Sequence, residues 1–330
     1  MSIDVSVIVP TYNRAGLITE TLDSILGQSH LPSEVIVVDD GSTDNTETIV
    51  RCYGRGVKYL YIENSGAPRA RNVGVAAATA DWIAFCDSDD LWHPEKLRLQ
   101  IRLFENAPEV EYGFTNFKTV VNGEWSKETK FDSLPPYYWN LAQSHIDEDS
   151  IVIRQPMFDR VLTRQPIFPS SVMLKRIFLE KIGGWNEQLG RTRGEDWEFT
   201  LRCVGSPIGV VFVPVVGIRK HDSNFSGDQL GTLLGEIAVL EYVLDHNSVL
   251  AAEYSRLIRE QISIRTANGA EAAFALGDFK QMQALLESVP FRSLRWKLQL
   301  KALIAYMPEN FGRVLQRAAR NASGLIRRHV

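Results

Sequence analysis

Ala84-Phe85-Cys86-Asp87-Ser88-Asp89-Asp90-Leu91-Trp92 is the stretch around which the fold of this chain is organised. An apolar run from Trp82 to Cys86 predicts a buried strand, and three carboxylates follow it within four residues. Ionised acids this close repel one another, so they cost stability unless a positive charge lies among them. Mg²⁺ is usually held by one or two carboxylates together with substrate phosphates. The stretch therefore predicts a strand-end site for metal and phosphate; the alternative is an acidic turn that caps the next helix.

Strand-like and helix-like segments alternate from the N-terminus to about residue 110. Apolar runs at 5–10, 34–38, 57–62 and 82–86 predict strands, and the segments between them have helical periodicity. This alternation favours parallel βαβ units and an α/β fold with a doubly wound, mostly parallel, Rossmann-like sheet. Ligands of such sheets bind beyond the carboxyl ends of the strands. Polar clusters follow each predicted strand: Thr11-Tyr12-Asn13, Asp39-Asp40, Asn64-Ser65-Gly66 and Asp87 to Asp90.

The pattern changes after residue 110. Asn122-Gly123 lies between two strand-like runs and predicts a hairpin, whereas the aromatic-rich residues 131–165 predict a long irregular loop or a small insertion. After Gly227 the sequence predicts helices only. The expected helix breaks lie near Asn247, Gly269, Gly277, Pro290 and Pro308. We therefore expect a domain at 1–225, with a nucleotide-binding half (1–110) and an acceptor-binding half (111–225), and a helical C-terminal region at 226–330.

Composition limits the class of protein. The chain is 45% hydrophobic and 23% charged, as globular proteins are, and no apolar run approaches the roughly 20 residues that span a bilayer. The N-terminus has no signal-peptide pattern. Three widely spaced cysteines form neither a disulfide framework nor a zinc pattern. We expect a cytoplasmic protein, with a peripheral position at the inner face of the membrane as a further candidate.

The net charge of −4 is unevenly distributed. Residues 291–330 contain nine Lys and Arg and one acid, Glu309, which gives +8, so the other 290 residues sum to −12. Apolar and basic residues at helical spacing in this segment are compatible with an interfacial helix on anionic lipid. The alternative is a helix that packs on the domain and leaves its basic face in solvent.

Five short motifs resemble the inverting family 2 glycosyltransferases of the GT-A fold. In chain order they are VSVIVPTYNR (5–14), EVIVVDDGSTD (34–44), ARNVG (70–74), DSDD (87–90) and GED (194–196). The resemblance covers about residues 3–225 and leaves out the C-terminal third. It implies a GT-A enzyme that moves a sugar from a nucleotide-sugar donor, first of all a UDP-sugar, to an acceptor hydroxyl with inversion. By analogy, the setting is cell-surface polysaccharide or glycolipid synthesis, with a saccharide or lipid-linked acceptor.

On the donor side the resemblance assigns the nucleotide base to the first two strand ends, that is, to Pro10, Thr11, Tyr12, Asp39 and Asp40. An ionised carboxylate can accept the N3–H of a uracil ring; the alternative for the two acids is a turn with a helix cap. Arg71 would lie near the base or the phosphates, and its alternative is a solvated helix position.

The same resemblance identifies Asp87-Ser88-Asp89 as the Asp-x-Asp motif, extended by Asp90. One acid would contact the ribose and another would coordinate Mg²⁺ or Mn²⁺, which neutralises charge on the leaving nucleoside diphosphate. Which of the three acids binds the metal stays open. His221, at a strand end, is a further metal or phosphate candidate, with a structural role as the alternative.

On the acceptor side Asp196 takes the place of the general base, which contributes about 10²–10⁴-fold in rate, and Glu195 lies beside it. The alternative is two acids in a first helical turn, which the macrodipole favours. Trp185 follows two glycines in a loop that resembles the acceptor-side loop of the family. Its ring could stack on a sugar, or it could be an ordinary buried Trp.

The sequence disfavours three other classes of protein. A nucleotidyltransferase would have a Gly-rich basic phosphate loop where Pro10 to Arg14 stand, and a nicotinamide dehydrogenase would have G-x-G-x-x-G after a strand. A non-catalytic nucleotide-sugar binding or scaffold protein would not need both the metal acids and Glu195-Asp196. We expect no nucleic-acid partner.

Overall fold

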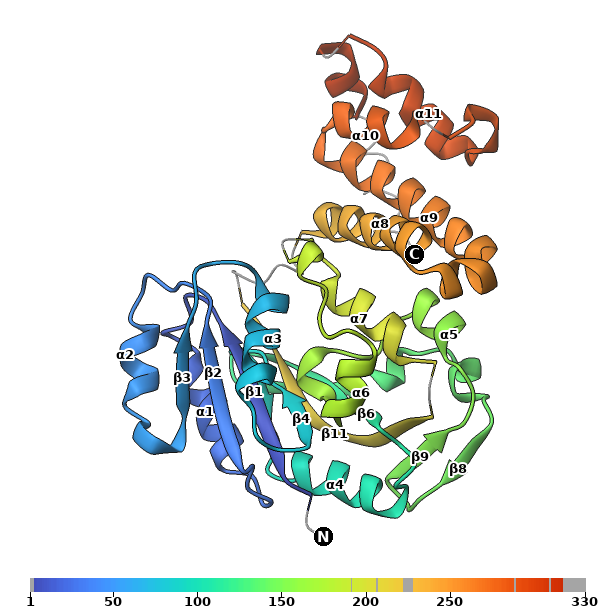
Figure 1. The fold of residues 1–330 in the computed structure, drawn as a ribbon. Coiled ribbons are helices and arrows are strands. Elements are labelled where there is room, and N and C mark those ends of the chain that lie inside the picture. Colours follow the sequence, from blue (N-terminus) through green and yellow to red (C-terminus); the bar gives the residue numbers. More distant parts are fainter. Residues whose placement is uncertain are drawn as a thin grey trace. The chain divides into compact units, whose positions relative to one another are not determined.

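The computed structural model describes residues 3–190, 192–205, 207–221, 228–287, 289–308 and 310–316. The chain divides into two compact units, residues 1–224 and 225–330, which we describe separately (Figure 1). In the part of the chain that is described, no helix has both the length and the apolar character needed to cross a membrane.

One mixed sheet forms the framework of the first unit (Figure 1). Its strands are β1 Val5–Thr11, β2 Glu34–Asp39, β3 Lys58–Tyr61, β4 Trp82–Phe85, β5 Leu91–Trp92, β6 Tyr112–Val121, β7 Glu124–Thr129, β8 Gln143–His145, β9 Ser150–Ile153, β10 Val172–Lys175 and β11 Ile208–Lys220. Their order is β3-β2-β1-β4-β10-β6-β11-β9-β8, with β5 on β11 and β7 on β6. β1 to β4 are mutually parallel, whereas β10 is antiparallel to both of its neighbours. The predicted α/β fold with a doubly wound sheet is confirmed.

Helices connect the strands of this sheet. They are α1 Ile18–Leu26, α2 Thr46–Arg51, α3 Ala67–Ala77, α4 Lys96–Asn106, α5 Phe158–Thr163, α6 Arg176–Lys181 and α7 Glu195–Cys203, with 3-10 turns at Gly54–Gly56, Phe131–Ser133, Pro136–Trp139, Pro169–Ser171 and Glu187–Leu189. α3 approaches β1 closely because Gly74 has no side chain: a Cβ there would lie 2.3 Å from Cγ2 of Ile8. β1 and β4 are buried on both faces, as central parallel strands are.

The acceptor half departs from prediction at two places. The hairpin is confirmed, with Asn122 and Gly123 at φ 51° and 82°, the left-handed values of a type I′ turn. Residues 131–165, however, are not one irregular loop, because they contribute β9, which is fully buried against β11. A four-residue apolar strand has too few residues for its periodicity to show. β11 continues through Pro214 as one strand, with irregular register there.

The second unit is helical, as predicted. Its helices are α8 Gln229–His246, α9 Ser248–Leu276, α10 Phe279–Leu286 and α11 Trp296–Ala305, with a 3-10 turn at Phe291–Ser293. Gly277 ends α9 with φ 80°, but the break expected at Gly269 is wrong, since α9 continues through it. A Cβ at Gly269 would lie 3.3 Å from Leu285, so the glycine permits close packing of two helices.

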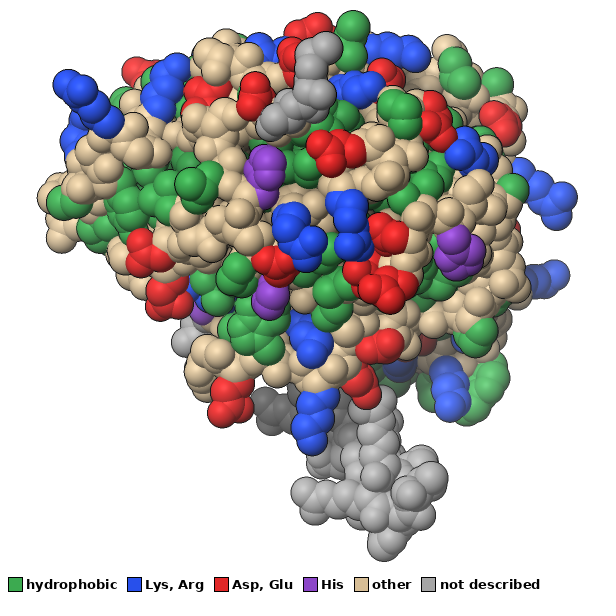
Figure 2. Space-filling view, turned by 90° about the horizontal axis from the view of Figure 1, so that it is seen from below, with side chains coloured by type: hydrophobic (Ala, Val, Ile, Leu, Met, Phe, Trp, Pro, Cys, Tyr) green, Lys and Arg blue, Asp and Glu red, His purple; other side chains and the backbone are tan. Residues whose placement is uncertain are grey.

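Charges of both signs are interspersed on the face of the molecule in Figure 2, with hydrophobic side chains in small groups between them. Lys96, in contrast, is a buried charge. It is 0% exposed, its Nζ lies 3.7 Å from the centroid of the Trp92 ring, and it has no hydrogen-bond partner among the described residues. Burial lowers the pKa of Lys96 from 10.5 to about 7.

Replacing Lys96 should therefore stabilise the protein. Lys96→Met keeps the volume and removes a buried amine without a hydrogen bond, which costs about 1–3 kcal/mol. Since the folded-state pKa lies below the unfolded one, the wild type loses stability as the pH falls from 10.5 towards 7, and the Met variant does not. Urea unfolding at pH 7 and pH 9 should show a larger gain at pH 7. Lys127→Met, on the exposed part of β7, is the matched control; a Lys96→Met variant no more stable than this control would contradict the account.

Candidate active site

The carboxyl ends of β1, β2 and β4 meet at one edge of the sheet, as the alternation predicted. Thr11 pairs with Asp39 across β1 and β2, and the Asp40 amide donates to the Thr11 carbonyl at 2.8 Å. β4 pairs with the other side of β1, so Asp87 follows at the same edge. Pro10 is buried within β1. This edge therefore brings together the strand-end residues predicted for the donor.

Asp39 holds the turn after β2. Its Oδ1 accepts from the Ser42 amide at 2.7 Å and its Oδ2 from the Tyr59 hydroxyl at 2.8 Å, and the residue is fully buried. Both oxygens are thus engaged inside the protein, each in one hydrogen bond, and the predicted contact of Asp39 with the nucleotide stays a prediction. The helix-cap alternative is not observed either, because α2 has Asn45 at its N-cap and no side-chain cap bond.

Asp40 ties the loop after β3 to this edge. Its two oxygens accept from the amides of Ser65 and Gly66 at 2.7 and 2.8 Å. Each oxygen keeps a further lone pair, so acceptance of a uracil N3–H stays a prediction. Beside it, Thr11 Oγ1 is buried without a hydrogen-bond partner among the described residues, and Tyr12 is exposed.

Arg71 of α3 is a buried cation at the centre of the site. It is 3% exposed, its Nη2 donates to Asp87 Oδ1 at 2.7 Å, and its Nη1 lies 3.6 Å from Glu195 Oε1. Burial disfavours the charge, but the carboxylates of Asp87 and Glu195 outweigh it and raise the pKa of Arg71. The solvated-helix alternative for Arg71 is therefore wrong. Its guanidinium links the donor edge to the acids of α7.

The two acids of α7 lie beside this cation. Gly194, with φ 93°, turns the chain into the helix, and Glu195 and Asp196 form its first turn. Burial, reinforced by the charges of Glu195 and Asp87 and opposed by Arg71, raises the pKa of Asp196 to about 7. Burial also raises the pKa of Glu195. A carboxylate placed only to complement the macrodipole would show a lowered pKa, so Asp196 has the character of a proton acceptor poised near neutral pH.

Trp185 does not present its ring to solvent. It is 2% exposed, stacks on Phe199 with centroids 3.9 Å apart and planes at 7°, and lies 4.3 Å below the Arg71 guanidinium. The predicted stacking of Trp185 on an acceptor sugar is therefore wrong, because both ring faces are covered. Asn72 fixes the loop, since its Nδ2 donates to the Trp185 carbonyl and its Oδ1 accepts from the Trp185 amide, both at 2.9 Å.

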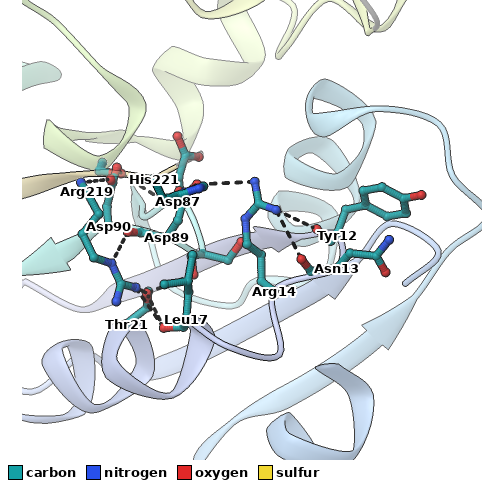
Figure 3. A network of polar contacts seen from close by, with 12 residues as sticks. Tyr12, Asn13, Arg14, Leu17, Thr21, Asp87, Asp89, Asp90, Arg219 and His221 are labelled. Carbon is teal, nitrogen blue, oxygen red and sulfur yellow. Dashed lines mark hydrogen bonds and ion pairs between the residues drawn. The ribbon is translucent and has the colours of Figure 1, made fainter. Parts of the chain in front are cut away.

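The acids after β4 differ in their surroundings (Figure 3). Asp89 lies between two cationic or titratable groups: its Oδ2 is 3.0 Å from His221 Nε2 and 3.4 Å from Arg14 Nη2. Arg14 Nη1 in turn donates to the carbonyls of Tyr12 and Asn13 at 3.3 and 3.2 Å. The end of β1 and the end of β11 therefore converge on Asp89.

Asp90 fixes the loop that follows β4. It is buried, and its oxygens accept from the Ser170 hydroxyl and the Arg219 amide. Burial and the neighbouring charges of Asp89 and Asp87 raise the pKa of Asp90 well above its usual range. Both oxygens have hydrogen bonds within the protein, so Asp90 is less accessible than Asp87 and Asp89, and its metal contact stays a prediction. Ser88 is also buried, and its carbonyl accepts from the Thr21 hydroxyl at 3.0 Å.

The helix-cap alternative for the acidic stretch is not observed. β5 separates the acids from α4, and α4 begins at Lys96 after Glu95, with no side-chain cap bond. The acids therefore belong to the loop after β4, at the edge of the sheet, and do not cap a helix.

Asp89 and His221 are the two side chains whose chemistry would suit a divalent cation. Among the described residues, no three or more His, Cys, Asp or Glu side chains gather into a metal cage. Mg²⁺ seldom needs one, since substrate phosphates and waters complete its shell. The Asp89 carboxylate and the His221 imidazole, 3.0 Å apart, fit such a site, and Asp87 is the next acid along the edge.

Sequence reasoning missed three residues that shape the site. The Arg219 guanidinium donates to the carbonyls of Leu17 and Asp89 and to Thr21 Oγ1, and so fastens α1 to the acidic loop. A charged residue at the end of an apolar strand run was the signal available for Arg219. Asn72 lies inside a quoted motif, and its loop-fixing role depends on a partner 113 residues away. Nothing in the sequence marks Ser170.

Comparisons with known proteins point to one family. A family model described as glycosyl transferase family 2 matches residues 6–162. An uncharacterized glycosyltransferase of Rickettsia typhi is 31% identical over 231 residues, covering 69% of this chain and 68% of the relative. TuaG of Bacillus subtilis, a glycosyltransferase assigned by name to teichuronic acid biosynthesis, is 40% identical over 120 residues, covering 35% of this chain and 47% of TuaG. The chain spans 59% of a similar Rickettsia prowazekii protein.

Among solved structures, residues 1–349 of S. aureus TarS in complex with UDP-GlcNAc have a TM-score of 0.62 to this chain at 20% identity. The match covers 97% of this chain and 92% of the TarS chain. At this identity the similarity concerns the fold.

Removing the central cation should destabilise the first unit. Arg71→Gln leaves Asp87 and Glu195 without their buried partner, which typically costs about 3–5 kcal/mol. The loss in urea unfolding should shrink at acidic pH, because the raised pKa values of Glu195 and Asp196 allow these acids to be protonated.

The matched control is Arg69→Gln on the same helix. Arg69 is half exposed and lies 3.8 Å from Glu187, so its loss should cost at most about 1 kcal/mol. Equal losses for the two variants would contradict the role assigned to Arg71.

Proposed function

Because this chain belongs to glycosyltransferase family 2 and has the GT-A fold, we propose that it transfers a sugar from a UDP-sugar to an acceptor hydroxyl with inversion at the anomeric carbon. The observation that carries the proposal is the cluster at Arg71. This cation joins Asp87, at the donor edge of the sheet, to the acids of α7, where Asp196 has a pKa of about 7. A single displacement needs one such proton acceptor beside the donor.

In the proposed reaction the acceptor hydroxyl gives its proton to the Asp196 carboxylate. The acceptor oxygen forms a bond to the anomeric carbon from the side opposite the diphosphate. The bond from that carbon to the diphosphate oxygen breaks, and the electron pair leaves with the nucleoside diphosphate. Asp196 is left neutral and Glu195 remains beside it on the acceptor side. A pKa near the working pH lets Asp196 accept the proton and release it again.

The nucleotide is proposed to bind along the strand ends. Asp40, Thr11 and Tyr12 would contact the base, with Pro10 shaping the strand end, and Arg71, Asp87, Ser88 and Asp89 would lie on the ribose and diphosphate side. Two relatives support a UDP-sugar and a polysaccharide setting: TarS was solved with UDP-GlcNAc, and TuaG is named for teichuronic acid biosynthesis. The acceptor would be a saccharide or a lipid-linked saccharide.

We further propose that Asp89 and His221 hold Mg²⁺ or Mn²⁺ together with the donor diphosphate, with Asp87 beside them. A cation bound there would stabilise the negative charge of the leaving diphosphate. The chain itself orients this pair: Arg14 contacts Asp89, while the Asp90 bonds to Ser170 and the Arg219 amide fix the loop.

Asp196→Asn should remove the proton acceptor and lower kcat/KM by about 10²–10⁴-fold while leaving UDP binding unchanged. In the wild type, kcat/KM should rise with pH to a plateau, with a midpoint near 7, because only the ionised carboxylate accepts a proton. The measurement is nucleotide release with a panel of sugar donors between pH 5 and 9.

Glu180→Gln, an exposed substitution on α6, is the control and should behave as the wild type. Wild-type turnover by Asp196→Asn would refute the base assignment. Donor binding without release of nucleotide under any condition would favour a non-catalytic binding protein, and pyrophosphate release from nucleoside triphosphates would favour a nucleotidyltransferase.

The cation site has its own test. Chelation should abolish nucleotide release, and Mn²⁺ or Mg²⁺ should restore it. Mn²⁺ binding in the presence of UDP, followed by electron paramagnetic resonance, should weaken about tenfold or more in Asp89→Asn and in His221→Ala. Glu20→Gln changes an exposed acid that contacts Arg219 but not the proposed cation, and this variant should keep wild-type Mn²⁺ affinity. Full activity after chelation would contradict the metal requirement.

A further inference from the structure

α11 carries apolar residues that point into solvent. Trp296, Leu300 and Leu303 are 68%, 53% and 53% exposed, and Met307, just beyond the helix end, is 43% exposed. The first three lie at positions i, i+4 and i+7, so they share one face of the helix. We call these four residues the α11 stripe.

The opposite face of α11 already serves the fold. Leu298, Ala302 and Ala305, again at i, i+4 and i+7, are buried in the core of the second unit with residues of α9 and α10. α11 is therefore apolar on two faces, and only one of them contributes to that core. Exposed apolar residues gathered on one face mark an interaction site far more often than single ones do.

The charged residues around α11 indicate what its exposed apolar face binds. Residues 289–316 contain five basic side chains against one acid, Glu309; the basic residues are Arg292, Arg295, Lys297, Lys301 and Arg313. Arg292, Arg295 and Lys297 are exposed at the N-terminal end of α11. Trp296 and Tyr306, both exposed, lie near the two ends of the helix. Aromatic residues at the ends and basic residues beside an apolar face are the composition of a helix that lies in the interface of an anionic bilayer.

We propose that the α11 stripe lies on the surface of an anionic lipid bilayer and holds the protein there as a peripheral contact. A second copy of the chain is a poorer occupant, because paired stripes would bring two basic surfaces together. Each exposed Lys or Arg near an anionic surface, in contrast, adds to the attraction. This contact does not depend on the proposed transfer reaction.

The test is flotation of the full chain with vesicles. Wild-type protein should float with vesicles of phosphatidylcholine and phosphatidylglycerol at low salt, and much less with phosphatidylcholine alone or at high salt. Leu300→Gln combined with Leu303→Gln should lower the partition coefficient about tenfold or more. Arg292→Gln, Arg295→Gln and Lys297→Gln together should lower it through charge alone, which keeps the proposal testable if the first variant fails to fold. The control, Leu31→Gln with Ile177→Gln, changes residues 65% and 66% exposed in the first unit and should bind as the wild type.

Three results would overturn the proposal. One is absence of wild-type binding to the anionic vesicles at low salt. Another is unchanged binding by both α11 variants. The third is a concentration-dependent oligomer, seen by light scattering, that the Leu300 and Leu303 substitutions dissociate, since a second copy would then cover the stripe.

Discussion

The site depends on the interaction of one buried guanidinium, that of Arg71, with three nearby carboxyl groups. Arg71 is bonded to Asp87 and lies near Glu195, while Asp196 follows in the same helical turn. One positive charge cannot neutralise three acids, so burial and mutual repulsion raise the pKa of Asp196 into the neutral range. The buried position of Arg71 also depends on the loop that carries Trp185. The Arg71 guanidinium lies over the Trp185 ring, and the Phe199 ring stacks on Trp185. The cluster around Arg71 therefore both packs the Trp185 loop and contains the acid of the proposed reaction.

The charge balance also explains why we propose a divalent cation. A nucleoside diphosphate would bring further negative charge to an edge that already carries Asp87 and Asp89. The arginines described there are each paired with acids or carbonyl groups of the chain: Arg14 with Asp89, Arg71 with Asp87, and Arg219 with backbone and Glu20. A cation held by Asp89, His221 and the diphosphate would supply the positive charge that this arrangement requires.

Much of this could be predicted from the sequence, because parallel strands send their carboxyl ends to one edge and the polar clusters follow the strands. Family resemblance then supplied roles for individual residues. What the sequence could not reveal depended on contacts between distant segments. The exposure of the Trp185 ring is decided by Phe199 and Arg71, and the engagement of Asp90 by Ser170 and Arg219, none of which local pattern reveals. The buried strand β9 was too short to show a period.

The proposed role of Asp196 requires a buried carboxyl that titrates near neutral pH. The most direct measurement is the titration of its side-chain carboxyl by ¹³C NMR in the free protein, assigned by comparison with Asp196→Asn. The account predicts a midpoint near 7, which falls when Glu195→Gln removes the neighbouring negative charge. A midpoint near the ordinary Asp value of about 3.9, unmoved by Glu195→Gln, would contradict it.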